Sequence, residues 1–84
     1  MDPFANRLRA LVAQAAAIDE SRVTLKAHLS AGLGIDSLMK LEVVSVVDKE
    51  LGICIPDECI FKIDTFEQMV DEARKRIQAI QEAV

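Results

Sequence analysis

The residues of this chain best suited to chemistry surround one serine. Ser37 stands where a glycine-containing run, Gly32-Leu33-Gly34-Ile35-Asp36, gives way to an amphipathic helical pattern. A hydroxyl at such a junction is exposed, so another protein can reach it and attach a group to it. A serine hydrolase would instead need Ser37 as its own nucleophile, with His28 and Asp36 as partners. The run lacks the glycines of a G-x-S-x-G elbow and the chain has no α/β pattern to hold one, so the sequence favours a serine that is modified.

The other potential ligands do not predict a metal site or a nucleotide site. Cys54 and Cys59 have a C-x4-C spacing that fits no common zinc pattern, and the single histidine, His28, cannot complete a tetrahedral set with them. We therefore expect two reduced thiols and no bound metal. Gly32 and Gly34 lack the third glycine and the preceding strand of a dinucleotide-binding fingerprint.

The expected compartment follows from the thiols and from the targeting signals that the sequence lacks. Residues 1–4 contain an aspartate and have neither the basic region nor the long apolar run of a secretory signal. No stretch reaches the roughly 18 apolar residues that a membrane span needs. Together with reduced cysteines, these features predict a cytoplasmic protein without membrane insertion.

The negative charge of the chain is concentrated after position 35. The formal net charge is −4, and residues 36–64 hold seven acidic and three basic side chains, against a net +1 before them and −1 after them. This balance argues against nucleic-acid binding and against binding to an anionic membrane surface. We expect partners with basic docking patches near Ser37, the alternative being an ordinary solvated acidic surface.

A small all-α bundle of three main helices and one short helix is expected to position these groups. The apolar spacing predicts, within a single domain over residues 1–84, helices at about 4–17, 37–51, 57–61 and 65–80. Pro3 suits the first turn of the first helix, and Gly52 ends the second helix. Thr65-x-x-Gln68 has the spacing of a capping box for the last helix.

The main helices carry apolar stripes that should face the core. In the last helix the stripe extends as far as Ile80. In the second helix it consists of Leu41, Val44, Val47 and Leu51. Leu38, Met39 and Val46 exceed what this stripe needs, so apolar surface should remain exposed beside Ser37.

Several segments around Ser37 also match the pattern of one known family. The central match is Leu33-Gly34-Ile35-Asp36-Ser37-Leu38, followed by Glu42 and by Gly52-Ile53-Cys54-Ile55-Pro56-Asp57-Glu58. With these residues, over roughly positions 4–80, the chain resembles an acyl carrier protein. The Asp-Ser-Leu triplet alone is a weak signal. Its place at a helix start, ahead of Ile-Pro-Asp-Glu in a small acidic domain, makes the resemblance specific.

The resemblance implies a carrier that does not itself catalyse a reaction. A phosphopantetheinyl transferase would move 4′-phosphopantetheine from coenzyme A onto Ser37, where it stays covalently attached. Asp36 matches the family position that lies beside the transferase's Mg²⁺ during transfer. The terminal thiol of the arm then holds an acyl group as a thioester. The implied partners are this transferase and acyl-transfer, synthase or ligase enzymes, and we expect the carrier to be a monomer.

The pattern of apolar and charged residues predicts two further sets for such a carrier. The first set is expected to contact partner proteins and comprises Leu38, Met39, Lys40, Glu42, Ser45 and Asp48. The second set is expected to line a cavity between the helices into which a fatty acyl chain inserts, and comprises Leu41, Val44, Val47, Ile55, Ile63 and Val70.

Departures from the fatty-acid carriers of the family bear on the pathway. Met39 stands where an acidic residue is usual, as do Ser30 and Ala31, and Lys40 and Lys49 place positive charge on a typically acidic helix. Repulsion between Lys40 and a partner's arginine would reject general fatty-acid enzymes. These departures favour a specialised carrier, such as one for polyketide synthesis, over the housekeeping fatty-acid carrier.

Two other interpretations stay open. A peptidyl or aminoacyl carrier would usually show a Gly-Gly-x-Ser-Leu pattern, which Gly34-Ile35-Asp36-Ser37 does not match. An unmodified interaction module could keep the same fold, with Ser37 serving only as the N-cap of its helix.

Overall fold

The protein is a bundle of α-helices joined by ordered loops. A computed structural model describes residues 1–82, and the elements follow in the order α1 (Pro3–Ala16), the short 3-10 helix η1 (Glu20–Arg22), α2 (Ser37–Leu51), α3 (Asp57–Ile60) and α4 (Phe66–Glu82). Within that range there is no strand, only an isolated bridge between His28 and Thr65. The predicted all-α class is confirmed. No helix among these residues has the length and apolar character needed to cross a membrane.

Capping residues define ends of each of the three long helices. Asp2 caps α1 through its side chain, and Pro3 occupies the first turn. Gly52 ends α2 with a φ of 67°, a left-handed conformation that glycine adopts without steric cost. The predicted capping box at α4 is confirmed, because Thr65 Oγ1 accepts from Gln68 N at 3.2 Å and Gln68 Oε1 accepts from Thr65 N at 3.1 Å.

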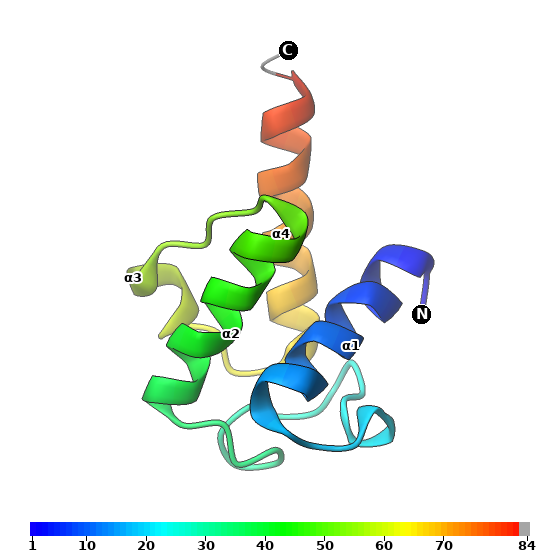
Figure 1. Ribbon diagram of the computed structural model, residues 1–84, viewed down its shortest axis with the longest axis vertical. Helices are drawn as coiled ribbons and strands as arrows, with labels where there is room; N and C mark the ends of the chain where they lie inside the picture. The colour runs from blue at the N-terminus through cyan, green and yellow to red at the C-terminus, as the bar shows by residue number, and fades with distance from the viewer. Residues whose placement is uncertain (83–84) are drawn as a thin grey trace.

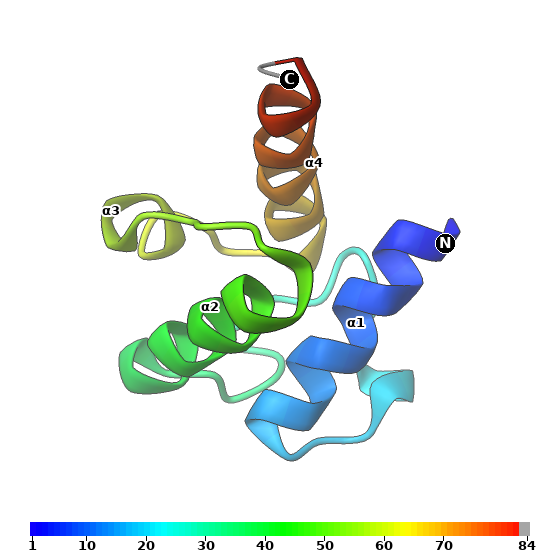
Figure 2. The same ribbon diagram turned by 45° about the horizontal axis from the view of Figure 1, so that its top comes forward.

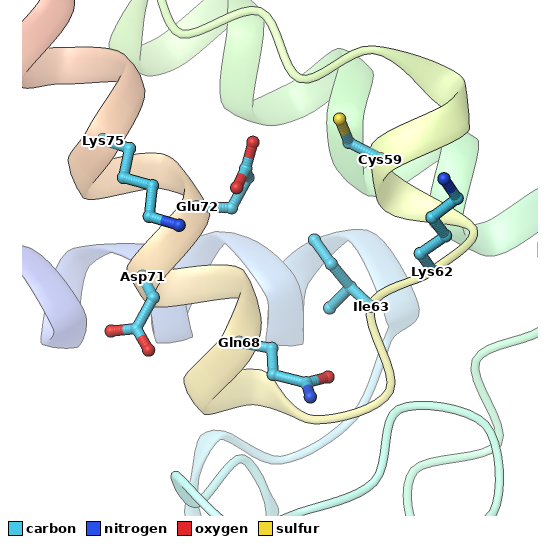
Figure 3. Close-up of a pocket in the computed structure, with 7 residues that line it drawn as sticks. All are labelled: Cys59, Lys62, Ile63, Gln68, Asp71, Glu72 and Lys75. Atoms are coloured by element: carbon cyan, nitrogen blue, oxygen red, sulfur yellow. The ribbon is translucent and has the colours of Figure 1, made fainter.

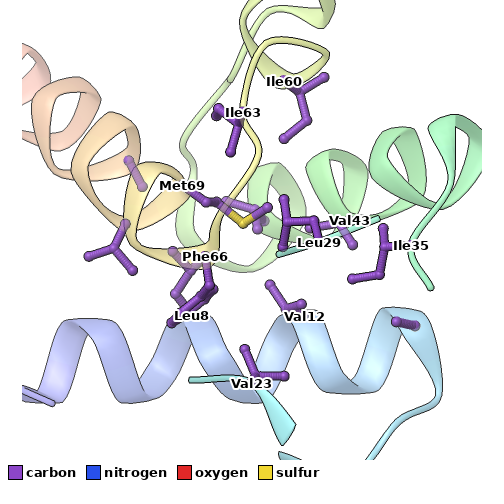
Figure 4. Packing of buried hydrophobic residues seen from close by; sticks show 14 of the residues in the cluster. Leu8, Val12, Val23, Leu29, Ile35, Val43, Ile60, Ile63, Phe66 and Met69 are labelled. Carbon is purple, nitrogen blue, oxygen red and sulfur yellow. The ribbon is translucent and has the colours of Figure 1, made fainter. Parts of the chain in front are cut away.

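The helices enclose one largely aliphatic core that includes Phe66 (Figure 4). Phe66 is fully buried at the start of α4, and Leu8 and Val12 of α1 belong to the same cluster. In Figures 1 and 2, α1 and α2 lie in the lower part of the molecule and α4 extends above them, with its C-terminal half standing clear of the other elements. Ile80, expected to be buried, is therefore exposed, since none of the other described elements reaches that part of α4.

The inward face of α2 differs from the predicted stripe. The buried residues are Lys40, Val43 and Val47, whereas Leu41, Val44 and Leu51 are only half-buried. Both sets recur at helical spacing, so periodicity alone did not separate them. The neighbours of α2 decide the rotation of the helix, and they turn Lys40 rather than Leu41 inward.

The long loop between α1 and α2 is held to the start of α4 by its backbone. Leu29 N donates to Asp64 O at 2.7 Å, and Phe66 N donates to Ala27 O at 3.0 Å. Val23 and Leu29 anchor the loop in the core with no exposed surface. The loop that leads into the N-terminus of α2 is thus ordered.

Candidate functional site

Ser37 is the first residue of α2, and its side chain is exposed. The N-cap is Asp36, whose Oδ1 accepts from Met39 N at 2.9 Å, while its carbonyl accepts from Lys40 N at 2.9 Å. Asp36 therefore does the capping that Ser37 could have done. This leaves the Ser37 hydroxyl available for modification at the helix terminus.

The chain approaches Ser37 through a tightly wound turn. Gly32 N and Leu33 N both donate to His28 O, at 2.9 and 3.0 Å. A Cβ on Gly32 would lie 2.8 Å from that same carbonyl oxygen, so a larger residue would force the backbone to move. Gly34 has a φ of 71°, which a residue with a side chain adopts only with strain. These two glycines fix the path of the chain into Asp36 and Ser37.

The surface beside Ser37 is formed by the outward face of α2. Leu38 is 77% exposed, which agrees with the apolar surface expected there. Glu42, Ser45 and Asp48 of the predicted partner-contacting set are exposed as well. Met39 departs from this pattern, since it is half-buried and packs against the core.

Lys40 lies inside the protein, and its predicted place on the partner-facing surface is wrong. The residue is only 9% exposed, and its Nζ donates to the carbonyl oxygen of Ile63 at 3.0 Å. The aliphatic stem of a lysine can fill a helix–helix gap while its ammonium reaches a polar partner. Lys40 therefore does not offer the charge that would repel a partner's arginine, although Lys49 remains exposed on the same helix.

Most of the residues expected to line an acyl cavity are packed in the core or against it. Val47, Ile55, Ile63 and Val70 are buried in the core, Val44 packs against it, and Leu41 is half-buried. A pocket of about 340 Å³ lies between the Cys59–Ile63 segment and α4 (Figure 3). Of the expected residues, only Ile63 lines it, and its other walls are Cys59, Lys62, Gln68, Asp71, Glu72 and Lys75.

Hydrogen bonds from Arg76 connect two residues that line this pocket, Glu72 and Cys59. Arg76 Nη2 lies 3.0 Å from Glu72 Oε1 and 3.4 Å from Cys59 Sγ. The hydrogen bond from Arg76 to Glu72 raises the pKa of Arg76, so the guanidinium stays protonated. Cys59 and Cys54 are both free, as expected for reduced thiols.

Two features of the site had no role in the sequence interpretation. Phe61, directly after α3, is 47% exposed, and its neighbours Ile60 and Lys62 gave no signal of this. The bond from Lys40 joins residues 23 positions apart and ends on a backbone carbonyl. A backbone acceptor leaves no trace in the sequence, so no residue pattern could have revealed this pairing.

The geometry at Ser37 suits a covalently attached anion. The N-terminus of an α-helix presents unpaired N–H groups and the positive end of the helix dipole. A phosphodiester on the Ser37 oxygen would lie at this end of α2, beside a hydroxyl that is exposed and not needed as the cap. The residues present therefore fit a phosphate-linked group.

Comparison with known proteins points to the same chemistry. The family model described as "Phosphopantetheine attachment site" matches residues 6–73. The chain is 41% identical over 71 residues to an acyl carrier protein of Treponema pallidum subsp. pallidum, a match that covers 84% of this chain and 87% of the relative. An acyl carrier protein of Treponema pallidum (strain Nichols) matches with the same identity and coverage.

Proposed function

The chain belongs to the acyl carrier protein family, and from this we propose that it holds acyl groups as thioesters on a 4′-phosphopantetheine arm attached to Ser37. Covalent 4′-phosphopantetheine is the cofactor of this family. The observation that carries the assignment to Ser37 is its exposed position at the start of α2, with the capping role taken by Asp36. When bound, the group supplies a thiol at the end of a flexible arm.

Attachment is a phosphoryl transfer in which Ser37 provides the accepting oxygen. A phosphopantetheinyl transferase would supply coenzyme A, with Mg²⁺ to stabilise the charge of its diphosphate. The Ser37 Oγ–P bond forms, a P–O bond of the diphosphate breaks, the hydroxyl proton passes to a base or to water, and the adenine nucleotide leaves. The contribution of this chain is to keep the hydroxyl in reach and the product phosphodiester at the positive end of α2.

Carrier proteins of this family work with a transferase and with biosynthetic enzymes, and for this chain we assign the docking surface to the outward face of α2. Leu38 supplies apolar contact beside Ser37, while Glu42 and Asp48 supply negative charge for basic patches on a partner. Exposed Lys49 makes this face less acidic than a purely charge-driven interface would be. This mixture supports a dedicated acyl or polyketide pathway rather than the housekeeping fatty-acid one. We place the protein in the cytoplasm as a monomer.

Intact mass spectrometry tests the proposal directly. The purified protein is incubated with a promiscuous phosphopantetheinyl transferase, Mg²⁺ and coenzyme A, and we expect its mass to rise by one phosphopantetheine group. An unchanged mass, with a known carrier modified in the same reaction, would instead favour an unmodified interaction module.

Substitutions of Asp36 separate its capping role from a role in the transfer. Asp36→Ala removes the cap and should cost about 1 kcal/mol of stability, a fall in Tm of roughly 4–8 °C. Asp36→Asn keeps a capping oxygen and should leave the Tm close to that of the wild type.

If the carboxylate acts beside the transferase's metal, both variants should be modified about 10–100-fold more slowly. Differential scanning calorimetry and timed mass spectra provide the two readouts. A normal modification rate in Asp36→Asn would restrict Asp36 to capping.

A further inference from the structure

A buried lysine closes the gap between α2 and the α3–α4 connection. Lys40 is the first residue of α2 whose side chain is buried, and it lies about one turn after Ser37. Its Nζ donates to Ile63 O at 3.0 Å, a bond that is itself buried. Because helical side chains lean toward the N-terminus, the stem of Lys40 lies on the Ser37 side of Val43 and Val47, the other buried residues of α2.

An acyl chain that entered the core between α2 and the α3–α4 connection would have to open this gap. Val47 of α2 and Ile63 both belong to the closed core, and Val44 packs against it. Separating α2 from Ile63 breaks the bond from Lys40 and leaves an ammonium group facing an alkyl chain. Burying a charged group without a partner is strongly unfavourable, so insertion is opposed at its first step.

Three pockets among the described residues each carry charged side chains. One of about 340 Å³ lies between the Cys59–Ile63 segment and α4, and five of its seven lining side chains are polar or charged (Figure 3). Lys40 itself lines a pocket of about 120 Å³, together with Asp64 and three loop residues. A pocket of about 180 Å³ includes Val70 but also Asp2, Glu67, Asp71 and Arg74. None of the three has the continuous apolar lining that a medium-length chain needs.

We propose that Lys40 is a specificity-determining residue that excludes acyl chains from the core, so that this carrier holds its cargo outside the helices. The inference rests on the proposed function, since it concerns the cargo of the arm on Ser37. It assigns the carrier to short or polar acyl groups, which lose little by staying in water. Lys40 acts through the gap that it closes and takes no part in the transfer chemistry.

Acyl chains of increasing length on the arm provide the test. The transferase is supplied with acetyl-, butyryl-, hexanoyl- or octanoyl-coenzyme A, loading is confirmed by intact mass, and the Tm of each loaded form is measured. We expect the wild-type series to vary by no more than about 3 °C. In Lys40→Met, which keeps the stem and removes the ammonium, the Tm should rise by more than about 10 °C from acetyl to octanoyl.

Lys49→Met is the matched control, since it removes an exposed lysine from the same helix and should give the flat wild-type series. A wild-type Tm that rises with chain length, or a flat series in Lys40→Met, would overturn the inference. If Lys40→Met does not fold, NMR of the wild type decides. Contacts between octanoyl protons and the methyl groups of Val47 or Ile63 would refute exclusion, and their absence beside assigned arm resonances would support it. Failure of loading would count against the proposed function instead.

Discussion

The Ser37→Ala variant is expected to keep its unmodified mass after incubation with transferase, Mg²⁺ and coenzyme A, while the wild type is converted completely. Alanine removes the one oxygen to which the phosphoryl group can be attached at the start of α2. The fold should be unaffected, because Ser37 is exposed and α2 is capped by Asp36. Alanine is also a good helix former in the first turn. Loss of modification with an unchanged Tm would separate attachment from folding.

Ser45→Ala provides the matched control for this experiment. Ser45 is a second exposed serine on α2, within the proposed docking surface, and its removal should still allow one group to be added. Modification that persists in Ser37→Ala would contradict the assignment of the site. Peptide mapping of the modified protein would then identify the residue that carries the group.

The second large effect is expected from Phe66→Ala, inside the core. Phe66 has 0% exposure, and removing its ring leaves a cavity next to the first turn of α4. Substitutions of this kind cost about 3–5 kcal/mol, and an 84-residue domain has a total stability of roughly 4–13 kcal/mol. We expect the Tm to fall by about 15–30 °C, or cooperative unfolding to disappear, in thermal denaturation followed by circular dichroism.

Phe61→Ala shows whether the effect depends on burial. Phe61 has the same side chain but is 47% exposed after α3, so its removal should change stability by about 0.5 kcal/mol or less. A similar loss of stability in both variants would mean that the effect of Phe66→Ala does not depend on burial of the ring. Phe61→Ala should also be tested for modification, because its exposed ring lies outside the proposed docking surface.

Local signals in the sequence were sufficient to predict the helices. The predicted α2, residues 37–51, agrees with Ser37–Leu51, because Asp36 caps its start and Gly52 stops it within a few residues of chain. Thr65 and Gln68 likewise marked the start of α4 through their capping box. The short helix η1 was not predicted, since only three residues form it and no apolar periodicity marks it. Its cap is the side chain of Asp19, which accepts from Ser21 N.

The sequence could not predict the rotation of α2 about its axis, and therefore not which of its residues face the core. A charged residue among apolar ones indicates an outward position, and Lys40 was interpreted in this way. The acceptor at Ile63 satisfies its ammonium inside the protein, and this contact exists only after α2 and the α3–α4 connection have come together. Ser37 was easier to recognise because its motif is contiguous and its exposure follows from its place at a helix start.

The backbone bonds that hold the loop before α2 have a mechanical consequence for the carrier. Leu29 is bonded both to Asp64 on one side and to Ile35 on the other, so the residue that leads into Asp36 is braced against the entry to α4. With the arm attached to Ser37 as proposed, its attachment point would therefore be held by backbone bonds on both sides of the loop. The region that the thiol could reach would be centred on Ser37 and limited by the length of the arm. An enzyme docked on the proposed α2 surface would then meet the cargo within a fixed distance of its own binding surface.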